Sequence, residues 1–127
     1  MTGYIGNIEE ITQENTFFRK VIYTGQHAQL VVMSLQPNED IGMEVHEVVD
    51  QFLRIEEGEG KVIINGEEHL VKDGDAIIVP AGTKHNVINT SSTKQLKLYT
   101  IYSPPHHKDD TIHKTKEEAV VDKEDHL

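Results

Sequence analysis

The sequence predicts an all-β fold, an antiparallel jelly-roll β-barrel followed by a short helical tail at the C-terminus. About eight short segments rich in β-branched and aromatic residues succeed one another, with turn residues between them. No helical period is evident before residue 112. Such strands at close intervals are typical of antiparallel sandwiches and barrels. At 127 residues the chain has room for one core, so we expect one barrel over residues 1–103 and a polar, histidine-containing tail over 104–127.

Local composition locates the individual strands. The strongest signal is Asn65-Gly66, the dipeptide that best accepts the positive φ angles of a type I′ turn, so the segments on either side of it should pair as a hairpin. The predicted strands are residues 16–24, 28–35, 61–64, 67–71, 76–79, 85–89 and 95–102, and residues 41–60 would form two adjoining strands if the chain turns back at residues 47–50. The residues expected in the core are Phe17, Phe18, Phe52, Leu53 and Ile55.

The two ends of the chain differ from this pattern. Residues 1–14 have few periodic apolar residues, and we expect them to cover the domain surface or to contact a partner. In the tail, Thr115 and Glu118 have the spacing of a helix capping box, which predicts one short helix. The tail histidines are His106, His107, His113 and His126, and the first three are expected to be solvated. The alternative is that the tail folds over the barrel mouth and one of these histidines acts as an acid or base.

Composition and charge exclude several classes of function. The formal net charge of −10 disfavours contact with nucleic acid or with anionic membrane surfaces. No cysteine is present, which excludes thiolate chemistry and leaves nitrogen and oxygen atoms as metal ligands. No apolar run approaches the roughly 20 residues of a membrane span, and the first residues lack the pattern of a secretory signal. We therefore expect a cytoplasmic protein whose partner is a small molecule.

One stretch joins a strand, a tight turn and a second strand that begins with a histidine. Its fixed positions are Gly74, Pro80, Gly82, His85 and Asn89, which follow the spacing G-x5-P-x-G-x2-H-x3-N. The glycines and the proline form turns, and a turn that starts a strand with an imidazole directs a metal ligand. At every fixed position this spacing resembles the second sequence motif of the cupin superfamily. Asn89 is expected to be a turn or strand-end residue rather than a ligand.

Residues 38–58 are similar to the first cupin motif, G-x5-H-x-H-x3 or 4-E-x6-G, in an altered form. Glu44 stands at the first histidine position and His46 at the second. The two residues are two apart, so on an extended strand their side chains share a face. Gln51 replaces the glutamate of the motif, and Asn38 replaces its first glycine. For Gln51 to face His46, the chain must turn back between them.

The resemblance implies a four-ligand metal site made of Glu44, His46, Gln51 and His85. The site keeps one carboxylate, but Glu44 supplies it from the first histidine position of the motif instead of the usual glutamate position. The ligand types resemble those of the cupin phosphomannose isomerases in a different order. A divalent ion there would keep a charge of about +1, with about two of six coordination positions left for water or substrate. Nitrogen and oxygen ligands without sulfur suit manganese, iron, nickel, cobalt or zinc.

A metal with open positions is a Lewis acid, which favours an enzyme acting on a small carboxylate or 2-oxo acid. In this hypothesis the metal stabilises an enolate during decarboxylation or isomerisation. Related cupins also include dioxygenases, so a dioxygenase is one alternative. Another is a module that binds a sugar or small acid without turnover. The acid or base candidates are Tyr99, Tyr102, His106 and His113. By analogy with cupins that pair through edge strands, we also expect a homodimer.

Overall fold

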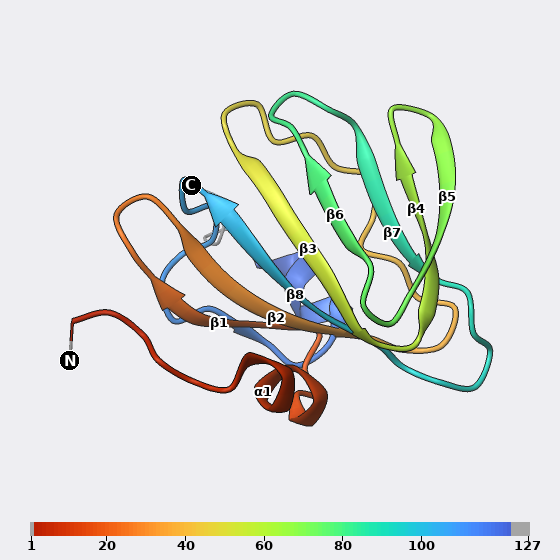
Figure 1. The fold of residues 1–127 in the computed structure, drawn as a ribbon, viewed down its shortest axis with the longest axis horizontal. Coiled ribbons are helices and arrows are strands. Elements are labelled where there is room, and N and C mark those ends of the chain that lie inside the picture. The colour runs from red at the N-terminus through yellow and green to blue at the C-terminus, as the bar shows by residue number, and fades with distance from the viewer. Residues whose placement is uncertain (1, 123–127) are drawn as a thin grey trace.

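Residues 2–122 are described by a computed structural model (Figure 1). The strands are β1 (Arg19–Thr24), β2 (Gln29–Leu35), β3 (Asp50–Glu57), β4 (Glu59–Ile64), β5 (Glu67–Lys72), β6 (Ala76–Val79), β7 (His85–Asn89), β8 (Leu96–Ser103) and β9 (Ile112–His113). The helices are α1 (Ile8–Glu14) and α2 (Lys116–Val121). The strands form two antiparallel sheets, one ordered β6-β3-β8-β2-β1-β9 and the other β5-β4-β7. This architecture confirms the predicted jelly-roll fold class.

The predicted strands agree closely with the observed ones because their signals are local. β6 and β7 have the predicted bounds, and β4 and β5 pair as a hairpin. The turn between them places Asn65 at φ 51° and Gly66 at φ 83°, both in the left-handed region. Asparagine and glycine tolerate that region better than other residues, which is why the dipeptide predicted the turn.

The hydrophobic core lies between the two sheets. Alternate residues of β2, β3 and β8 point inward, so that Leu53, Ile55 and Leu98 are fully buried. Phe18 is also in the core, as predicted. Phe52 is not: it follows the opposite parity, is half-buried, and packs on the outer face of the six-stranded sheet. Phe17 is likewise half-buried and lies outside the core cluster.

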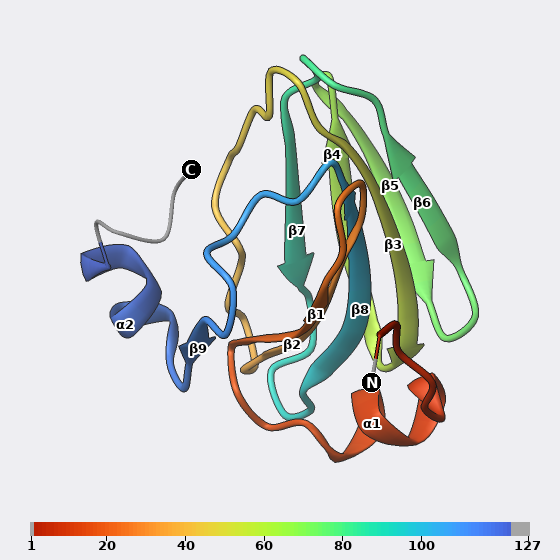
Figure 2. The ribbon, with the colours of Figure 1, turned by 90° about the vertical axis from the view of Figure 1, so that its left-hand side faces the viewer.

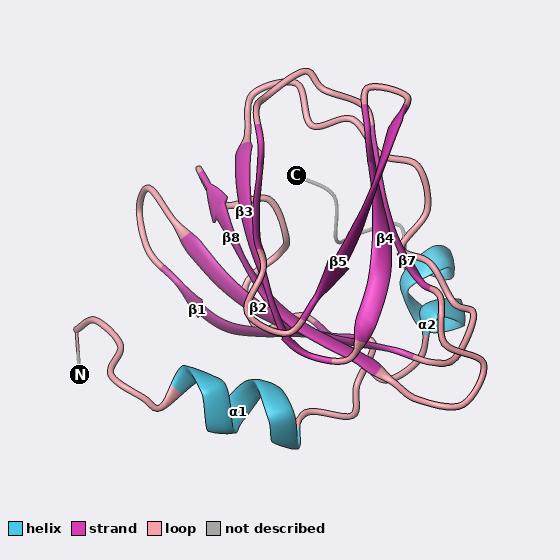
Figure 3. Ribbon diagram, turned by 45° about the vertical axis from the view of Figure 1, so that its right-hand side comes forward, coloured by secondary structure: helices cyan, strands magenta, loops and turns pink. Residues whose placement is uncertain are grey.

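The N-terminal segment contains a helix that the sequence did not lead us to expect. Asn7 caps α1, and its side-chain oxygen accepts a hydrogen bond from the Glu10 amide. The helix packs against the outer face of the six-stranded sheet, where Lys97 donates to the carbonyl of Gln13 (Figure 3). Thr12 is buried in this contact. The expectation of no helix before residue 112 is therefore wrong.

The C-terminal tail docks on the barrel rather than extending into solvent. β9 pairs with β1, and α2 begins at the predicted cap, where Thr115 accepts a hydrogen bond from the Glu118 amide (Figure 2). His107 and His113 are 1% and 3% exposed, so the expectation that they are solvated is wrong. His126 lies outside the described residues. Neither described helix has the length and apolar composition needed to cross a membrane.

Candidate metal centre

Glu44 and His85 are brought together by backbone pairing. The chain before Glu44 runs antiparallel to β7, and the two residues exchange backbone hydrogen bonds of 2.9 Å in both directions. Directly opposed residues of an antiparallel pair point to the same face. Both side chains therefore point into the same space between the sheets.

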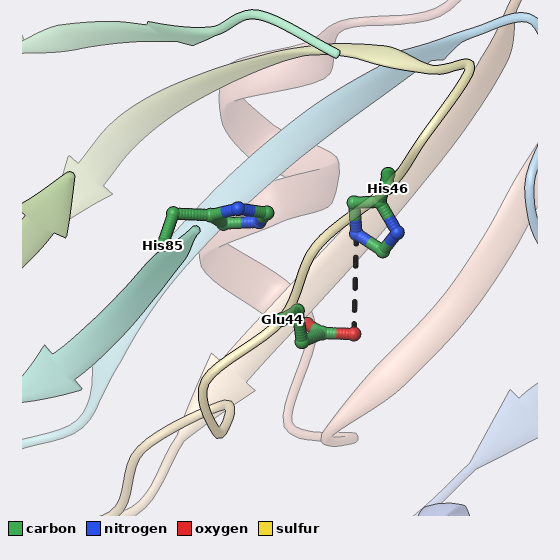
Figure 4. Close-up of side chains that lie close together, drawn as sticks. All are labelled: Glu44, His46 and His85. Atoms are coloured by element: carbon green, nitrogen blue, oxygen red, sulfur yellow. Dashed lines mark ion pairs between the residues drawn. The ribbon is translucent and has the colours of Figure 1, made fainter. Parts of the chain in front are cut away.

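His46 follows two residues after Glu44 and points to the same side. Its carbonyl accepts a 2.8 Å hydrogen bond from the amide of Gly82, whose φ of 80° shapes the turn before β7. The ligand atoms of Glu44, His46 and His85 all lie within 4.8 Å of one another. Figure 4 shows the three side chains converging. Pro80 and Gly82 thus act as turn residues that fix the position of a histidine, as predicted.

Gln51 approaches the same cluster from the opposite sheet. The chain bends after His46, as the spacing required, and Gln51 lies inward near the start of β3. Its Oε1 atom lies 3.1 Å from His85 Nε2, while its Nε2 atom donates to the Thr100 hydroxyl at 3.0 Å. The structure therefore brings Gln51 into contact with His85, one of the three clustered residues.

The electrostatics of His46 favour a neutral ring. Burial, followed by the neighbouring His106 and His85, lowers the pKa of His46 to about 3. The 3.9 Å approach of Glu44 Oε2 to His46 Nε2 is consequently no salt bridge at neutral pH. The Nε2 atom is buried and has no hydrogen-bond partner among residues 2–122. A buried polar atom without a partner is costly unless something binds it.

The orientation of His85 also fits a cation. Its Nδ1 atom lies 3.0 Å from the Thr83 carbonyl, so Nδ1 carries a proton and the neutral ring has its lone pair on Nε2. That lone pair faces Oε1 of Gln51. Both atoms are then acceptors, so the contact is unfavourable as it stands. A second proton on the ring, a Gln51 amide turned through 180°, or a cation bound by both atoms would each make it favourable. A cation would also satisfy His46 Nε2, so the residues fit a divalent metal.

A segment after β8, residues 104–108, crosses the barrel mouth, and we call it the strap. It places the ring of His106 4.2 Å from the ring of His46, centroid to centroid. Tyr102 is buried and stands edge-on to His46 at 5.9 Å, and its hydroxyl lies 3.2 Å from His107 Nε2. The strap therefore brings His106 to the candidate centre, and Tyr102 reaches it from β8.

The other two acid or base candidates lie elsewhere. Tyr99 has the opposite strand parity to Tyr102, and its ring packs against Phe52 on the outer face of the sheet. His113 contacts Asp122 at 2.8 Å and Arg19 at 3.4 Å, in the contact between β9 and β1. The structure does not bring either side chain to the cluster.

One feature of the site was not singled out from the sequence. Gln29 is a fully buried polar residue that anchors the strap, and its signal was a polar side chain at the apolar parity of β2. Asn38, which replaces a glycine of the motif, has a φ of 63°. Asparagine is among the few other residues that tolerate this conformation, so the turn survives the replacement.

Comparison with known proteins agrees with this geometry. A family described as Cupin domain matches residues 31–102. The chain belongs to the cupin family. A crystal structure of the BH2720 protein from Bacillus halodurans has a TM-score of 0.91 and 46% sequence identity, and the match covers 94% of each chain. A crystal structure of a predicted oxalate decarboxylase from Thermotoga maritima has a TM-score of 0.59 and 25% identity, covering 63% of this chain and 69% of that one.

Two curated relatives are similar over most of this cupin chain. YrkC of Bacillus subtilis is 51% identical over 124 residues, which are 93% of this chain and 66% of YrkC. A protein of Acanthamoeba polyphaga mimivirus is 47% identical over 108 residues, which are 82% of this chain and 67% of the viral protein. The chain thus spans about two thirds of the length of these relatives.

Proposed function

We propose that this cupin binds a divalent transition metal and acts on a small carboxylate or 2-oxo acid, in a decarboxylation or an isomerisation. The observation that carries the proposal is the buried His46 Nε2 atom, which has no hydrogen-bond partner within the described part of the chain and lies beside the Glu44 carboxylate and His85. Two imidazoles and a carboxylate at this spacing are a typical donor set for such an ion. Gln51 would supply the fourth donor through Oε1.

Different residues would coordinate the ion, partly neutralise its charge and orient the ligands. Glu44 supplies the single negative charge, and Thr83 orients His85 through its Nδ1 proton. When bound, the metal would supply Lewis acidity at its open coordination positions. With about one positive charge left on the centre, an anionic ligand with two oxygen donors is favoured. A small carboxylate or 2-oxo acid meets this description.

Proton transfer in either reaction falls to residues at the mouth. Tyr102 and His106 lie close to the cluster, and Tyr102 is linked through its hydroxyl to His107. Each can hold or deliver a proton beside the bound carboxylate. The similarity to the predicted oxalate decarboxylase, at 25% identity, supports a reaction that releases carbon dioxide.

The first test is the metal content of protein purified without chelators. We expect a stoichiometric transition metal that is lost in both Glu44→Gln and His85→Ala. Glu67→Gln is the matched control, because Glu67 and His69 repeat the Glu-x-His spacing on the exposed strand β5. The metal-loaded protein is then incubated anaerobically with 2-oxo acids while carbon dioxide and isomer formation are followed. No metal after incubation with manganese, iron, nickel, cobalt and zinc would refute the proposal.

Two alternatives correspond to distinct outcomes of this experiment. Oxygen consumption by the iron-loaded protein would identify a dioxygenase. Tight carboxylate or sugar binding without turnover would identify a binding module, which is the other use of the same barrel.

We also infer a homodimer formed through the outer face near the edge strand β6. In register across four strands, this face carries the apolar side chains of Leu30, Ile101, Phe52 and Ile78. Ile78 is 68% exposed although it ends an apolar row, and exposed apolar rows next to a sheet edge favour self-association. The cytoplasmic location expected from the sequence stays a prediction.

A further inference from the structure

Gln29 connects the barrel wall to the strap. It lies at the start of β2, is 1% exposed, and stands opposite Tyr102 of β8. Its Oε1 atom accepts hydrogen bonds from the amides of His106 at 3.1 Å and His107 at 2.9 Å. Its Nε2 atom donates to the carbonyl of His107 at 2.7 Å and to the hydroxyl of Thr24 at 2.9 Å. The side-chain amide therefore pairs with the strap backbone much as a neighbouring strand would.

This anchoring determines where His106 lies. Because both amides and one carbonyl at positions 106 and 107 are bonded to Gln29, the strap backbone has little freedom at this point. The ring of His106 is consequently placed 4.2 Å from that of His46, 5.4 Å from that of Tyr102 and 4.8 Å from that of His107. His106 is half-buried, whereas His107 is fully buried. His106 is thus the strap histidine that is partly open to solvent beside the cluster.

We propose that His106 contacts the carboxylate ligand of the centre through an imidazole N–H, and that Gln29 is the positioning residue that holds His106 there. This inference rests on the proposed metal-dependent function and names one further residue that recognises the ligand. Neither residue belongs to the predicted donor set, and His106 comes after the residues that match the family.

The chemistry of a chelating carboxylate gives such a residue a role. A ligand that binds a metal through two oxygens directs its other oxygens away from the metal, and those oxygens need hydrogen-bond donors once the site excludes water. Glu44 and Gln51 Oε1 offer acceptors only. An imidazole N–H beside the centre supplies a hydrogen-bond donor, and it adds no negative charge that would compete with the carboxylate for the metal. A bond of this kind to a charged group changes affinity by about tenfold or more.

The test uses cobalt as the metal and oxalate as the carboxylate probe, since the visible spectrum of cobalt reports changes in its ligands. The variants are His106→Ala, Gln29→Met, the double variant, and Thr24→Val. The last is the matched control: it removes one bond of Gln29 but leaves its three bonds to the strap. Cobalt stoichiometry and the oxalate Kd are measured for each. Amide exchange at His106 and His107 is measured separately in metal-free wild type and Gln29→Met.

We expect every variant to bind cobalt at the wild-type stoichiometry. His106→Ala and Gln29→Met should each raise the oxalate Kd about tenfold, and the double variant should raise it no further because both changes remove the same contact. Thr24→Val should stay within about twofold of wild type. Metal-free Gln29→Met should exchange the His106 and His107 amides about tenfold faster.

The contrary outcomes are distinguishable. If wild type binds neither cobalt nor manganese, iron, nickel or zinc, the proposed function fails and this inference fails with it. If wild type and His106→Ala bind cobalt and oxalate equally well, the metal site stands and this inference alone is overturned. Loss of cobalt from His106→Ala would make His106 a metal ligand, which also contradicts the proposal. Unchanged amide exchange in Gln29→Met would refute the positioning role. If Gln29→Met does not fold, His106→Ala still decides the ligand contact.

Discussion

The Nε2 atom of His85 lies 3.1 Å from the Oε1 atom of Gln51, and the other ring nitrogen of His85 lies 3.0 Å from the Thr83 carbonyl. One side of the imidazole is therefore held by a hydrogen bond, while the lone pair on its other nitrogen is directed at an amide oxygen, as it would be if a cation lay between them. An uncharged oxygen at this position is a weak metal ligand compared with a carboxylate. The centre should consequently bind its metal less tightly than the same site with a glutamate.

The first prediction follows for Gln51→Glu. A second carboxylate should lower the Kd for manganese by about tenfold, because ligand charge is a main determinant of cation affinity. Calorimetry on chelator-stripped protein measures this. Gln95→Glu adds the same charge just before β8, where Gln95 accepts a hydrogen bond from Ser34, and should leave the Kd unchanged. Weaker manganese binding by Gln51→Glu would contradict the ligand assignment.

Glu44→Gln should have the opposite effect. Loss of the single anionic donor should weaken metal binding by more than about 100-fold, which exceeds the usual effect of residues that merely orient a ligand. The same calorimetric titration measures the loss, and circular dichroism checks that the variant folds. Glu67→Gln should bind metal as wild type does. Full metal content in Glu44→Gln would show that the carboxylate is no ligand.

Asn89 should matter for stability and not for metal. Its side-chain amide is buried and donates to the carbonyls of Leu35, Gln36 and Lys94, which join the ends of two strands. Asn89→Ala leaves these carbonyls without that donor and should lower the free energy of unfolding by about 3 kcal/mol. Urea denaturation measures it, with the exposed Thr90→Ala expected within about 0.5 kcal/mol of wild type. A metal defect at unchanged stability would contradict this role.

Docking of the tail should depend on pH through Asp40. A hydrogen bond from Lys116 of α2, and then one from Asn86, lowers the pKa of Asp40. A carboxylate with a lowered pKa in the folded state stabilises the fold above its unfolded pKa of about 3.9 and loses that contribution as pH falls through the folded pKa. The free energy of unfolding of wild type should therefore exceed that of Lys116→Met near neutral pH.

This difference should be at most about 1 kcal/mol, because the Asp40 side chain is 37% exposed and solvent screens the pair. It should shrink as the pH falls below about 4. Thermal unfolding of both proteins across the pH range measures it. A difference that grew in acid would contradict the contribution of Asp40.

The dimer should depend on the outer face. Ile78→Lys places a charge in the apolar row and should convert a dimer into a monomer, as light scattering on the eluting peak would show. Leu70→Lys is the control, since Leu70 is 83% exposed on β5 of the other sheet. A wild-type mass of one chain would refute the dimer. Dissociation by Leu70→Lys alone would move the interface to the smaller sheet.

Local signals explain what the sequence predicted well. The hairpin around Asn65-Gly66 follows from backbone preference, and the short strands follow from composition and turns. The approach of Glu44 to His46 follows from strand parity. These relationships hold within a few residues or within one turn, so they are readable without a structure. The approach of His85, which lies far away in the sequence, is implied only by the resemblance of its motif to the second cupin motif.

The missed features depend on long-range contacts. The helix α1 is too short to be stable alone, and it is stabilised by packing against β8, β3 and β2. Its Asn7 cap was therefore a weak signal in the sequence. The parity of β8, which turns Tyr102 inward and Tyr99 outward, was not fixed by the sequence. Burial of His107 depends on Gln29, a residue of β2 far away in the sequence, whose hydrogen bonds to the strap backbone leave no local pattern.

The strap has a consequence for how this cupin diverges from its relatives. The donors of the candidate centre come from positions 44–85, inside the matched family region, whereas His106 comes from a segment that follows it. Two stretches of sequence would therefore have separate roles: one would bind the metal ion and the other would select the carboxylate that binds to it. Changes in the second stretch can alter ligand preference without disturbing the first. Relatives with identical donors and different straps are accordingly the natural place to look for inherited changes of substrate.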